Sequence, residues 1–225
     1  MKQLTTYAFR LTFLSLLTTY AFRLPTYGAF DNITSGARAL ALSGTFVARD
    51  DSVYSIYYNP AGISFLTSPQ VAAEYRKYYP GMDDSSNIYS GDLLAAYPLR
   101  QNAPKVAEKN NLFTVGVGYQ NLNLTDIYSE SLMCLTFGVP VIDEVSAGLS
   151  IKSMQQKYIV SGNAYYDGDA VFLKSNASSA VDADFGVLVK PLDWLSGGLS
   201  LTNFTRRKYG ISEDQISLDS TQRLG

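Results

Sequence analysis

The chain has 225 residues and a formal net charge of −2, so it lacks the basic surface that nucleic acids require of a binding partner. It contains no histidine and a single cysteine, Cys134, which excludes histidine triads, paired-cysteine zinc sites and disulfides within the chain. Its 17 tyrosines and 11 phenylalanines suit a sheet with one apolar face, and aromatic residues are favoured at membrane interfaces.

The first 29 residues have the pattern of a secretory signal peptide. Lys2 and Arg10 give a basic start, and Leu11 to Phe22 form a short apolar core before small residues follow. The core is shorter than the ~20 apolar residues of a transmembrane helix. The sequence therefore predicts a signal peptide over residues 1–29.

Residues 30–66 differ from the rest of the chain because they mix apolar runs with an acidic pair. Asp50 and Asp51 precede Ser52 to Tyr58, and carboxylates accept hydrogen bonds from the free N–H groups of a first helical turn. We expect these aspartates to cap a short helix there. The alternative is a cation site at the same two carboxylates.

The end of this short helix is predicted at the sequence Asn59-Pro60-Ala61. A proline disfavours helical geometry in the residue before it, and Gly62 then frees the chain to leave in a new direction. Two interpretations are compatible: the stop fixes the exit direction of the segment, or it gates a ligand path.

From residue 67 onward the chain alternates with a period of two, as strands with two unlike faces do. The predicted strands are Leu112–Gln120, Leu132–Val139, Val145–Lys152, Val181–Lys190 and Leu195–Thr202, with Val71–Tyr79 and Leu93–Leu99 less regular. One face of each is apolar, and the other carries glycine, serine and threonine with few charges.

This pairing of faces favours a transmembrane β-barrel, in which small polar residues point inward and apolar residues point outward. A soluble β-sandwich is the alternative, but its outward face would carry many charged residues. Short connections are predicted at 140–144 and 191–194, as periplasmic turns, and long ones at 80–90, 101–111 and 155–180, as outer loops.

The inward face of the barrel is predicted to carry three charged residues. Asp182 and Asp184 lie on the small-residue face of their strand, and Lys190 lies on the same side. A salt-bridge network and a polar translocation path are both open readings of this group. Cys134 falls on the same face, where we expect it to be a small buried residue.

The strand count leaves two architectures open. Residues 221–225 look like the start of a further strand, so the chain is either a small eight-stranded barrel or part of a larger one. We expect the larger one, because an open edge in lipid would leave backbone groups unsatisfied.

The stretch from Gly36 to Ala48, followed by Asp50-Asp51 and Tyr58-Asn59-Pro60-Ala61-Gly62, resembles the N-terminus of FadL-type outer-membrane proteins and their PorV-like relatives. The turn and strand at 191–199 are similar to later repeats of this group. Ser43 stands where the family pattern often has glycine. The resemblance is best over residues 36–66.

This resemblance implies an all-β, antiparallel up-and-down transmembrane barrel of about fourteen strands, with residues 30–66 as a plug in its lumen. Residues 67–225 would then supply roughly half of the wall. It further implies an outer-membrane location and passage of hydrophobic small molecules such as long-chain fatty acids, or, in the PorV-like branch, docking of secreted protein clients. The implied plug residues are Asp50, Asp51, Tyr58, Asn59, Pro60, Ala61 and Gly62.

The sequence does not predict a catalytic site. The chain has many serines but no histidine base and no G-x-S-x-G motif, so we do not expect an enzyme. No cofactor, metal or nucleic-acid partner is predicted. The expected partners are outer-membrane lipid and a hydrophobic ligand or a protein client.

Overall fold

The computed structural model describes residues 30, 35–81, 87–100, 111–125, 127–160, 162, 168–172, 175–211, 216–217 and 220–225. The chain divides into two compact units, Met1–Asp31 and Asn32–Gly225, and the structure below is that of the second. The signal peptide predicted over residues 1–29 lies outside the described residues.

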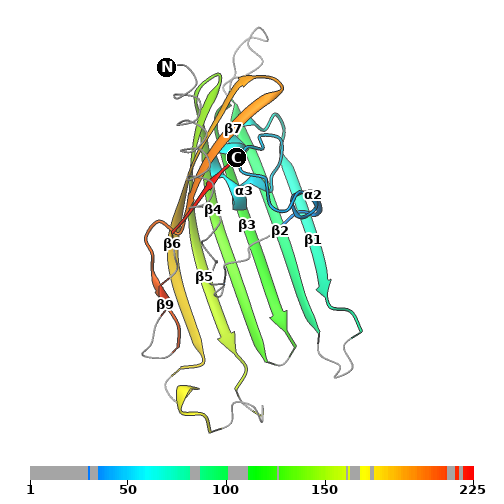
Figure 1. Cartoon of the computed structure of the whole chain (residues 1–225), viewed down its shortest axis with the longest axis vertical. Coiled ribbons are helices and arrows are strands. Elements are labelled where there is room, and N and C mark those ends of the chain that lie inside the picture. Colours follow the sequence, from blue (N-terminus) through cyan, green and yellow to red (C-terminus); the bar gives the residue numbers. More distant parts are fainter. Residues whose placement is uncertain are drawn as a thin grey trace, which may run out of the picture. The chain divides into compact units, whose positions relative to one another are not determined.

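An eight-stranded antiparallel sheet forms the body of this unit, with each strand beside the next in the sequence (Figure 1). Its strands, in order, are β1 (Gln70–Tyr78), β2 (Ile88–Arg100), β3 (Asn111–Leu124), β4 (Tyr128–Ile142), β5 (Val145–Tyr158), β6 (Ala177–Leu192), β7 (Leu195–Thr202) and β10 (Thr221–Leu224). The predicted all-β, up-and-down topology is confirmed. Among the described residues, β1 pairs only with β2, and β10 only with β7.

A second, two-stranded sheet pairs β8 (Lys208–Tyr209) with β9 (Ile216–Ser217), and a single 3-10 turn, η2, spans Ala170–Phe172. The strand expected at residues 221–225 exists as β10, which is antiparallel to β7. The turn η2 lies between β5 and β6 in the sequence, and the small sheet lies between β7 and β10, and neither changes the order of the main sheet.

Most strands are longer than the alternating stretches that predicted them. The strands β3, β4 and β6 have 14, 15 and 16 residues. The predicted ranges ended where the apolar residues ended, but the backbone ladder continues through polar positions, since Lys157 still pairs with Ala177. Backbone pairing does not depend on side-chain polarity, so the apolar alternation underestimates strand length.

The two faces of the sheet are those that the alternation predicts. We call the face that contacts residues 35–66 the inner face and the opposite one the outer face. On β4, Cys134 and Thr136 are buried on the inner face, whereas Met133 and Leu135 are exposed on the outer face. Leu188, the apolar exception on the inner face of β6, is fully buried.

The connections correct one prediction. Because successive strands are antiparallel, the β2–β3 connection at residues 101–110 lies at the same end of the sheet as the tight turns at 143–144 and 193–194. We call this the turn end; the opposite, loop end carries the connections at 79–87 and 159–176. The loops at 80–90 and 101–111 were both predicted as outer loops, but a single strand separates them, so they lie at opposite ends.

The N-terminal segment, residues 35–66, forms short helices that lie against the inner face toward the turn end (Figure 1). They are α2 (Ala37–Ala41), α3 (Ser55–Tyr58) and the 3-10 helix η1 (Pro60–Phe65). Both parts contribute to the core: the largest fully buried side chains include Tyr58, Phe46, Ile56, Ile63 and Leu66 of the segment and Leu94, Leu132, Met154 and Leu188 of the sheet.

Candidate functional site

The candidate site is the interface between the N-terminal segment and the inner face, and Asn59 is its centre. The Asn59 side chain is fully buried. Its Nδ2 donates to the carbonyls of Val47 (2.7 Å) and Val187 (3.1 Å), and its Oδ1 accepts from the Ala61 N–H at 3.1 Å. One amide therefore joins two passes of the segment to each other and to β6.

The helix stop predicted at Asn59-Pro60 is confirmed. The helix α3 ends at Tyr58, and Asn59 is extended, with φ −156° and ψ 105°. The chain then begins η1, in which Pro60 occupies the first turn, where its missing N–H costs no hydrogen bond. Asn59 is thus both the end of one helix and the N-cap of the next.

Gly62 has a different role from the predicted change of direction. It lies inside η1, and a Cβ there would meet the Arg49 carbonyl oxygen at 2.5 Å and the Ser55 Oγ at 2.7 Å. Gly62 is required because two turns of the segment approach each other too closely for any side chain. The neighbouring Ala61 is fully buried, and its carbonyl accepts from Ser146 Oγ on β5 at 3.0 Å.

Glycines on the inner face form a cradle for the segment. At Gly116 an added Cβ would meet Ile56 Cδ1 at 2.8 Å, and at Gly138 it would meet Ile63 Cγ1 at 2.8 Å. Further along, Gly148 and Gly186 leave room for the backbone of Pro60 and the side chain of Asn59. The small-residue face predicted from the alternation is therefore occupied by residues 35–66 and not by solvent alone.

Tyr58 fixes the start of the segment. Its hydroxyl donates to the Ser35 carbonyl at 2.9 Å and accepts from the Ser35 N–H at 3.1 Å. Its ring packs on Phe46, with centroids 5.3 Å apart. Burial raises the pKa of the Tyr58 hydroxyl, and that of Tyr57 as well, so both remain neutral phenols at physiological pH.

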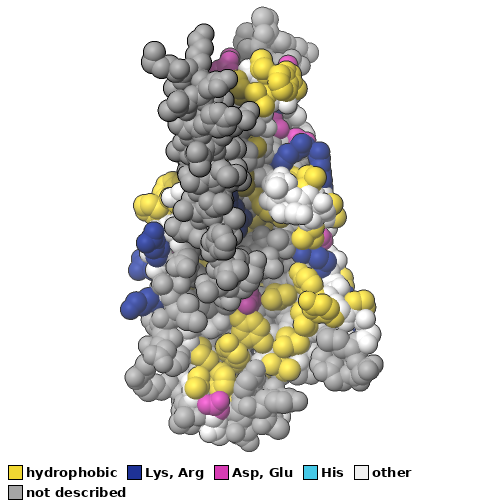
Figure 2. All heavy atoms as spheres, in the orientation of Figure 1, with side chains coloured by type: hydrophobic (Ala, Val, Ile, Leu, Met, Phe, Trp, Pro, Cys, Tyr) yellow, Lys and Arg dark blue, Asp and Glu magenta, His cyan; other side chains and the backbone are white. Residues whose placement is uncertain are grey.

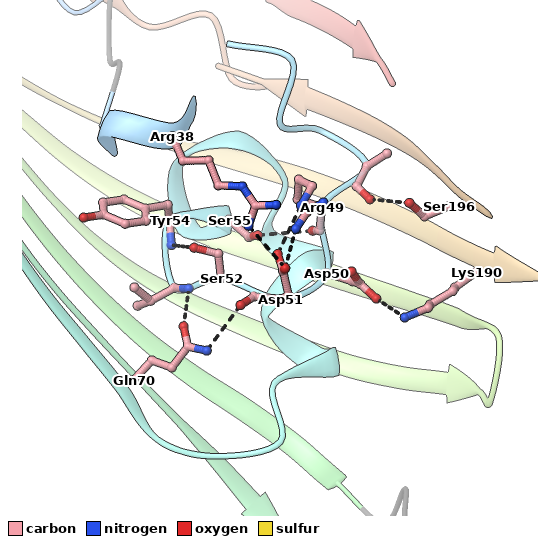
Figure 3. Close-up of polar contacts among 12 residues, drawn as sticks. Arg38, Arg49, Asp50, Asp51, Ser52, Tyr54, Ser55, Gln70, Lys190 and Ser196 are labelled. Carbon is pink, nitrogen blue, oxygen red and sulfur yellow. Dashed lines mark hydrogen bonds and ion pairs between the residues drawn. The ribbon is translucent and has the colours of Figure 1, made fainter. Parts of the chain in front are cut away.

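Asp50 and Asp51 do not cap a helix, which corrects the prediction (Figure 3). The N-cap of α3 is Tyr54, with no side-chain hydrogen bond. Asp50 instead pairs with the Lys190 ammonium on β6, and Asp51 pairs with Arg38 and Arg49 within the segment. The carboxylates form ion pairs with cationic side chains, and no described backbone N–H group donates to them.

Two residues that bind the segment at the same surface, Gln70 and Ser196, were missed by the sequence analysis. Gln70, the first residue of β1, accepts from the Val53 N–H at 2.8 Å and donates to the Asp51 carbonyl at 3.3 Å (Figure 3). Ser196 on β7 donates to the Ala48 carbonyl at 2.8 Å. Neither residue belongs to a local motif, so only the fold identifies them.

The charged inner-face group divides into two sites, because Lys190 binds Asp50 and not the other predicted aspartates. Asp184 pairs with Lys152 at 2.8 Å, and both side chains are buried. Asp184 also accepts from the Asn203 N–H at 2.8 Å, and Asp182 accepts from the Thr205 N–H at 2.9 Å. The aspartates thus anchor the chain that follows β7 beside β6.

A further ion-pair cluster on β1 and β2 was also missed. Arg76 lies between Glu74 (3.2 Å) and the buried Asp92 (3.0 Å), and its Nη1 donates to the Tyr78 hydroxyl. Glu74 accepts from the Gly36 N–H at 2.7 Å, which fixes the start of α2 to β1. The signal was present, since these charged residues share the inward positions of alternating strands.

Comparison of the chain with protein-family models, with curated proteins and with solved structures finds no match. Within the ranges described here, no helix has the length and apolarity needed to cross a bilayer. The same ranges contain no group of three or more acidic, histidine or cysteine side chains placed to hold a metal ion.

The site is a packed, hydrogen-bonded interface between the segment and the inner face. Its hydrogen bonds join the segment to β1, β5, β6 and β7, and its aliphatic side chains fill the glycine cradle. No backbone–backbone hydrogen bond joins the described residues of the segment to these strands. The segment is therefore held by side chains and packing, not by strand pairing.

Proposed function

We propose that the sheet is part of the wall of a transmembrane β-barrel in the bacterial outer membrane, with residues 35–66 as a plug in its lumen. The barrel passes hydrophobic small molecules, such as long-chain fatty acids, when the plug moves. This is the function that the FadL-type resemblance implies, and the outer face of the sheet supports it independently.

The observation that carries the proposal is the alignment of apolar residues across the outer face. The strand register places them in rows that each cross six neighbouring strands, β1–β6 in one row and β2–β7 in the other. One row is Val71, Ala95, Val117, Leu135, Ile151 and Ala183. The next row toward the turn end is Tyr97, Val115, Phe137, Leu149, Phe185 and Leu201.

These rows form a band of limited height. On β6 the outward apolar positions run from Val181 to Val189, which is roughly 27 Å along a strand at ~3.3 Å per residue. The lipid-facing band of outer-membrane barrels is ~25 Å tall and is crossed by tilted strands. A tilted strand crosses a bilayer with ~9–11 residues, and the nine residues from Val181 to Val189 fall at the lower end of that range.

The band has a polar border at the loop end. The bordering row is Tyr75, Gly91, Asn121, Ser131, Gln155 and Ser179. One row further out, Lys77 and Lys157 are the charged residues of the outer face of β1–β7, where no outward position is acidic. A water-exposed sheet face would carry both signs of charge, so this distribution favours lipid.

The inner face supports the plug part of the proposal. The segment covers the cradle, and its described residues make no backbone–backbone hydrogen bond to a strand, so it can leave without breaking the sheet. Beside it lies a cavity of about 420 Å³, between residues 43–49 and the strands β7 and β10. A cavity of this size falls within the range of small-ligand sites.

The experiment locks the plug to the wall. Cysteines replace Ala48 and Ser196, whose backbone carbonyl and Oγ lie 2.8 Å apart, in a Cys134→Ser background. The full chain is placed in lipid vesicles, cross-linked with a short bifunctional thiosulfonate reagent that forms reducible disulfides, and tested for uptake of a fluorescent long-chain fatty acid. Uptake is expected to fall to the level of empty vesicles and to return on reduction, whereas the single-cysteine variants stay active.

Two results would contradict the proposal in different ways. Uptake no greater than in empty vesicles, with the uncross-linked protein inserted, removes transport by this chain. Unchanged uptake after complete cross-linking removes the plug as the gate. Co-purification of secreted proteins with an inactive barrel would favour the docking function instead.

A further inference from the structure

A basic segment borders the apolar band on the outer side of β6. After β7, the chain continues through Phe204, Thr205, Arg206, Arg207 and Lys208, all of which are exposed. Figure 2 shows lysine and arginine side chains gathered at the edge of the view where Figure 1 draws the chain after β7. Three adjacent cations stand out on an outer face that otherwise carries few charges.

The segment is held in place by the inner-face aspartates. Asp184 accepts from the Asn203 N–H and Asp182 accepts from the Thr205 N–H, at 2.8 and 2.9 Å. The Phe204 N–H donates to the Ala183 carbonyl at 2.9 Å, and its ring meets Phe185 edge-on at 5.1 Å. The cations therefore occupy a fixed position and do not hang from a free loop.

A groove connects the cations to the apolar band. It has a volume of about 380 Å³. It is lined by outward positions of β5 and β6, from Ile151 and Ala183 in the band to Ser179 in the polar border, and by Thr205, Arg207 and Lys208. Ala180 and Asp182 of β6 also border it, but both are buried, and Asp182 accepts a hydrogen bond from the Thr205 N–H. One end of the groove is apolar and the other is cationic.

The level of the groove identifies its occupant. Val181 is the last apolar residue of the band on β6, and Ser179 belongs to the border row. In a bilayer placed around the band, the cations lie at the depth of lipid headgroups, where basic residues attract phosphate. Lys157, in the next row outward on β5, adds to the same field.

We propose that the groove at Arg206–Lys208 binds an anionic lipid, with its phosphate on the basic side chains and an acyl chain over Ile151, Val181 and Ala183. The inference rests on the proposed membrane placement and adds a specific lipid site to it. Neither the plug nor the transport step is needed for this site.

The test uses a tryptophan at the groove. Trp194 is the only tryptophan of the chain, so Trp194→Phe with Phe204→Trp gives a single reporter beside the cations. The full chain is inserted into phosphatidylcholine vesicles that contain brominated phosphatidylglycerol or brominated phosphatidylcholine. Thr205→Trp is a second reporter position, because Thr205 is exposed and lines the same groove.

The anionic lipid is expected to quench the reporter at a concentration about fivefold lower than the neutral lipid, from the attraction of several basic residues. Arg206→Gln, Arg207→Gln and Lys208→Gln together are expected to abolish this preference. Lys77→Gln is the matched control, since Lys77 occupies the row of Lys157 on the distant strand β1, and it should leave the preference unchanged.

The outcomes separate this proposal from the membrane placement. Equal quenching by both lipids, or a preference that survives the triple substitution, overturns the lipid site and leaves the membrane placement intact. Absence of quenching by either lipid at both reporter positions overturns the membrane placement itself.

Discussion

Asn59 bonds to three stretches of backbone through one buried amide, and only glutamine, which is one methylene longer, carries the same donors and acceptor. Its two amide protons reach carbonyls of the segment and of β6, and its oxygen accepts the first free N–H of η1. Aspartate has the same shape but lacks the donors. The position therefore determines whether the segment docks.

We expect Asn59→Leu to destabilise the docked state by about 3 kcal/mol or more, because two buried carbonyls and one N–H lose their partners. The measurement is denaturant unfolding in vesicles, followed by fluorescence. Asn176→Leu is the control, since Asn176 is partly exposed and its side chain donates to the Tyr158 carbonyl at 3.0 Å, so its loss should cost about 1 kcal/mol or less. Equal costs at both positions would argue against the role of Asn59.

The glycine cradle gives a second prediction at the scale of single residues. Gly148→Ala places a methyl group against the Pro60 carbonyl oxygen, so it should expel the segment and expose it to protease. Gly91→Ala should have no such effect, because its nearest neighbour is the Glu74 carbonyl at 3.9 Å. Limited proteolysis compares the two. A protected segment in Gly148→Ala would show that the cradle does not require glycine.

At the scale of elements, the buried Lys152–Asp184 pair joins β5 to β6 and to the chain after β7. Asp184→Leu should cost about 3–5 kcal/mol, because it leaves the Lys152 ammonium buried without its counter-charge. Lys152→Met in the same chain should recover about 2 kcal/mol or more of that loss. Denaturant unfolding of the single and double variants checks this, and additive losses would contradict the pairing.

The strands were predicted correctly wherever apolar and polar residues alternate with a period of two. The alternation at residues 112–120, 132–139 and 145–152 located strands and assigned their faces, because a period of two has a single structural meaning. It could not give strand ends, since backbone pairing continues through polar residues. The prediction also placed the 101–111 loop at the loop end. The loop lies at the turn end, because one strand separates it from the loop at 80–90.

The site was predicted where a residue acts locally and was missed where it acts at a distance. The helix stop at Asn59-Pro60 depends on neighbouring residues, so the sequence revealed it. Asp50 was predicted as a cap, yet its partner Lys190 is 140 residues away. The roles of Gly62 and Ser196 likewise depend on contacts that only the folded chain creates.

At the scale of the whole molecule, the two faces of one sheet have different roles. The inner face binds the N-terminal segment, which packs on glycines and is held by side-chain contacts. The outer face presents aligned apolar rows with a polar border. The central claim is that these outer rows contact lipid. Every functional proposal above depends on that placement.

Site-directed spin labelling measures the placement most directly. In a Cys134→Ser background, single cysteines replace Val117 and Phe137 within the band, and Asn123 and Lys157 beyond its border. The labelled full chain is inserted into vesicles and exposed to oxygen, which concentrates in lipid, and to a water-soluble nickel complex. The labels at 117 and 137 should relax with oxygen, and those at 123 and 157 with nickel. Accessibility of the labels at 117 and 137 to nickel would contradict the account.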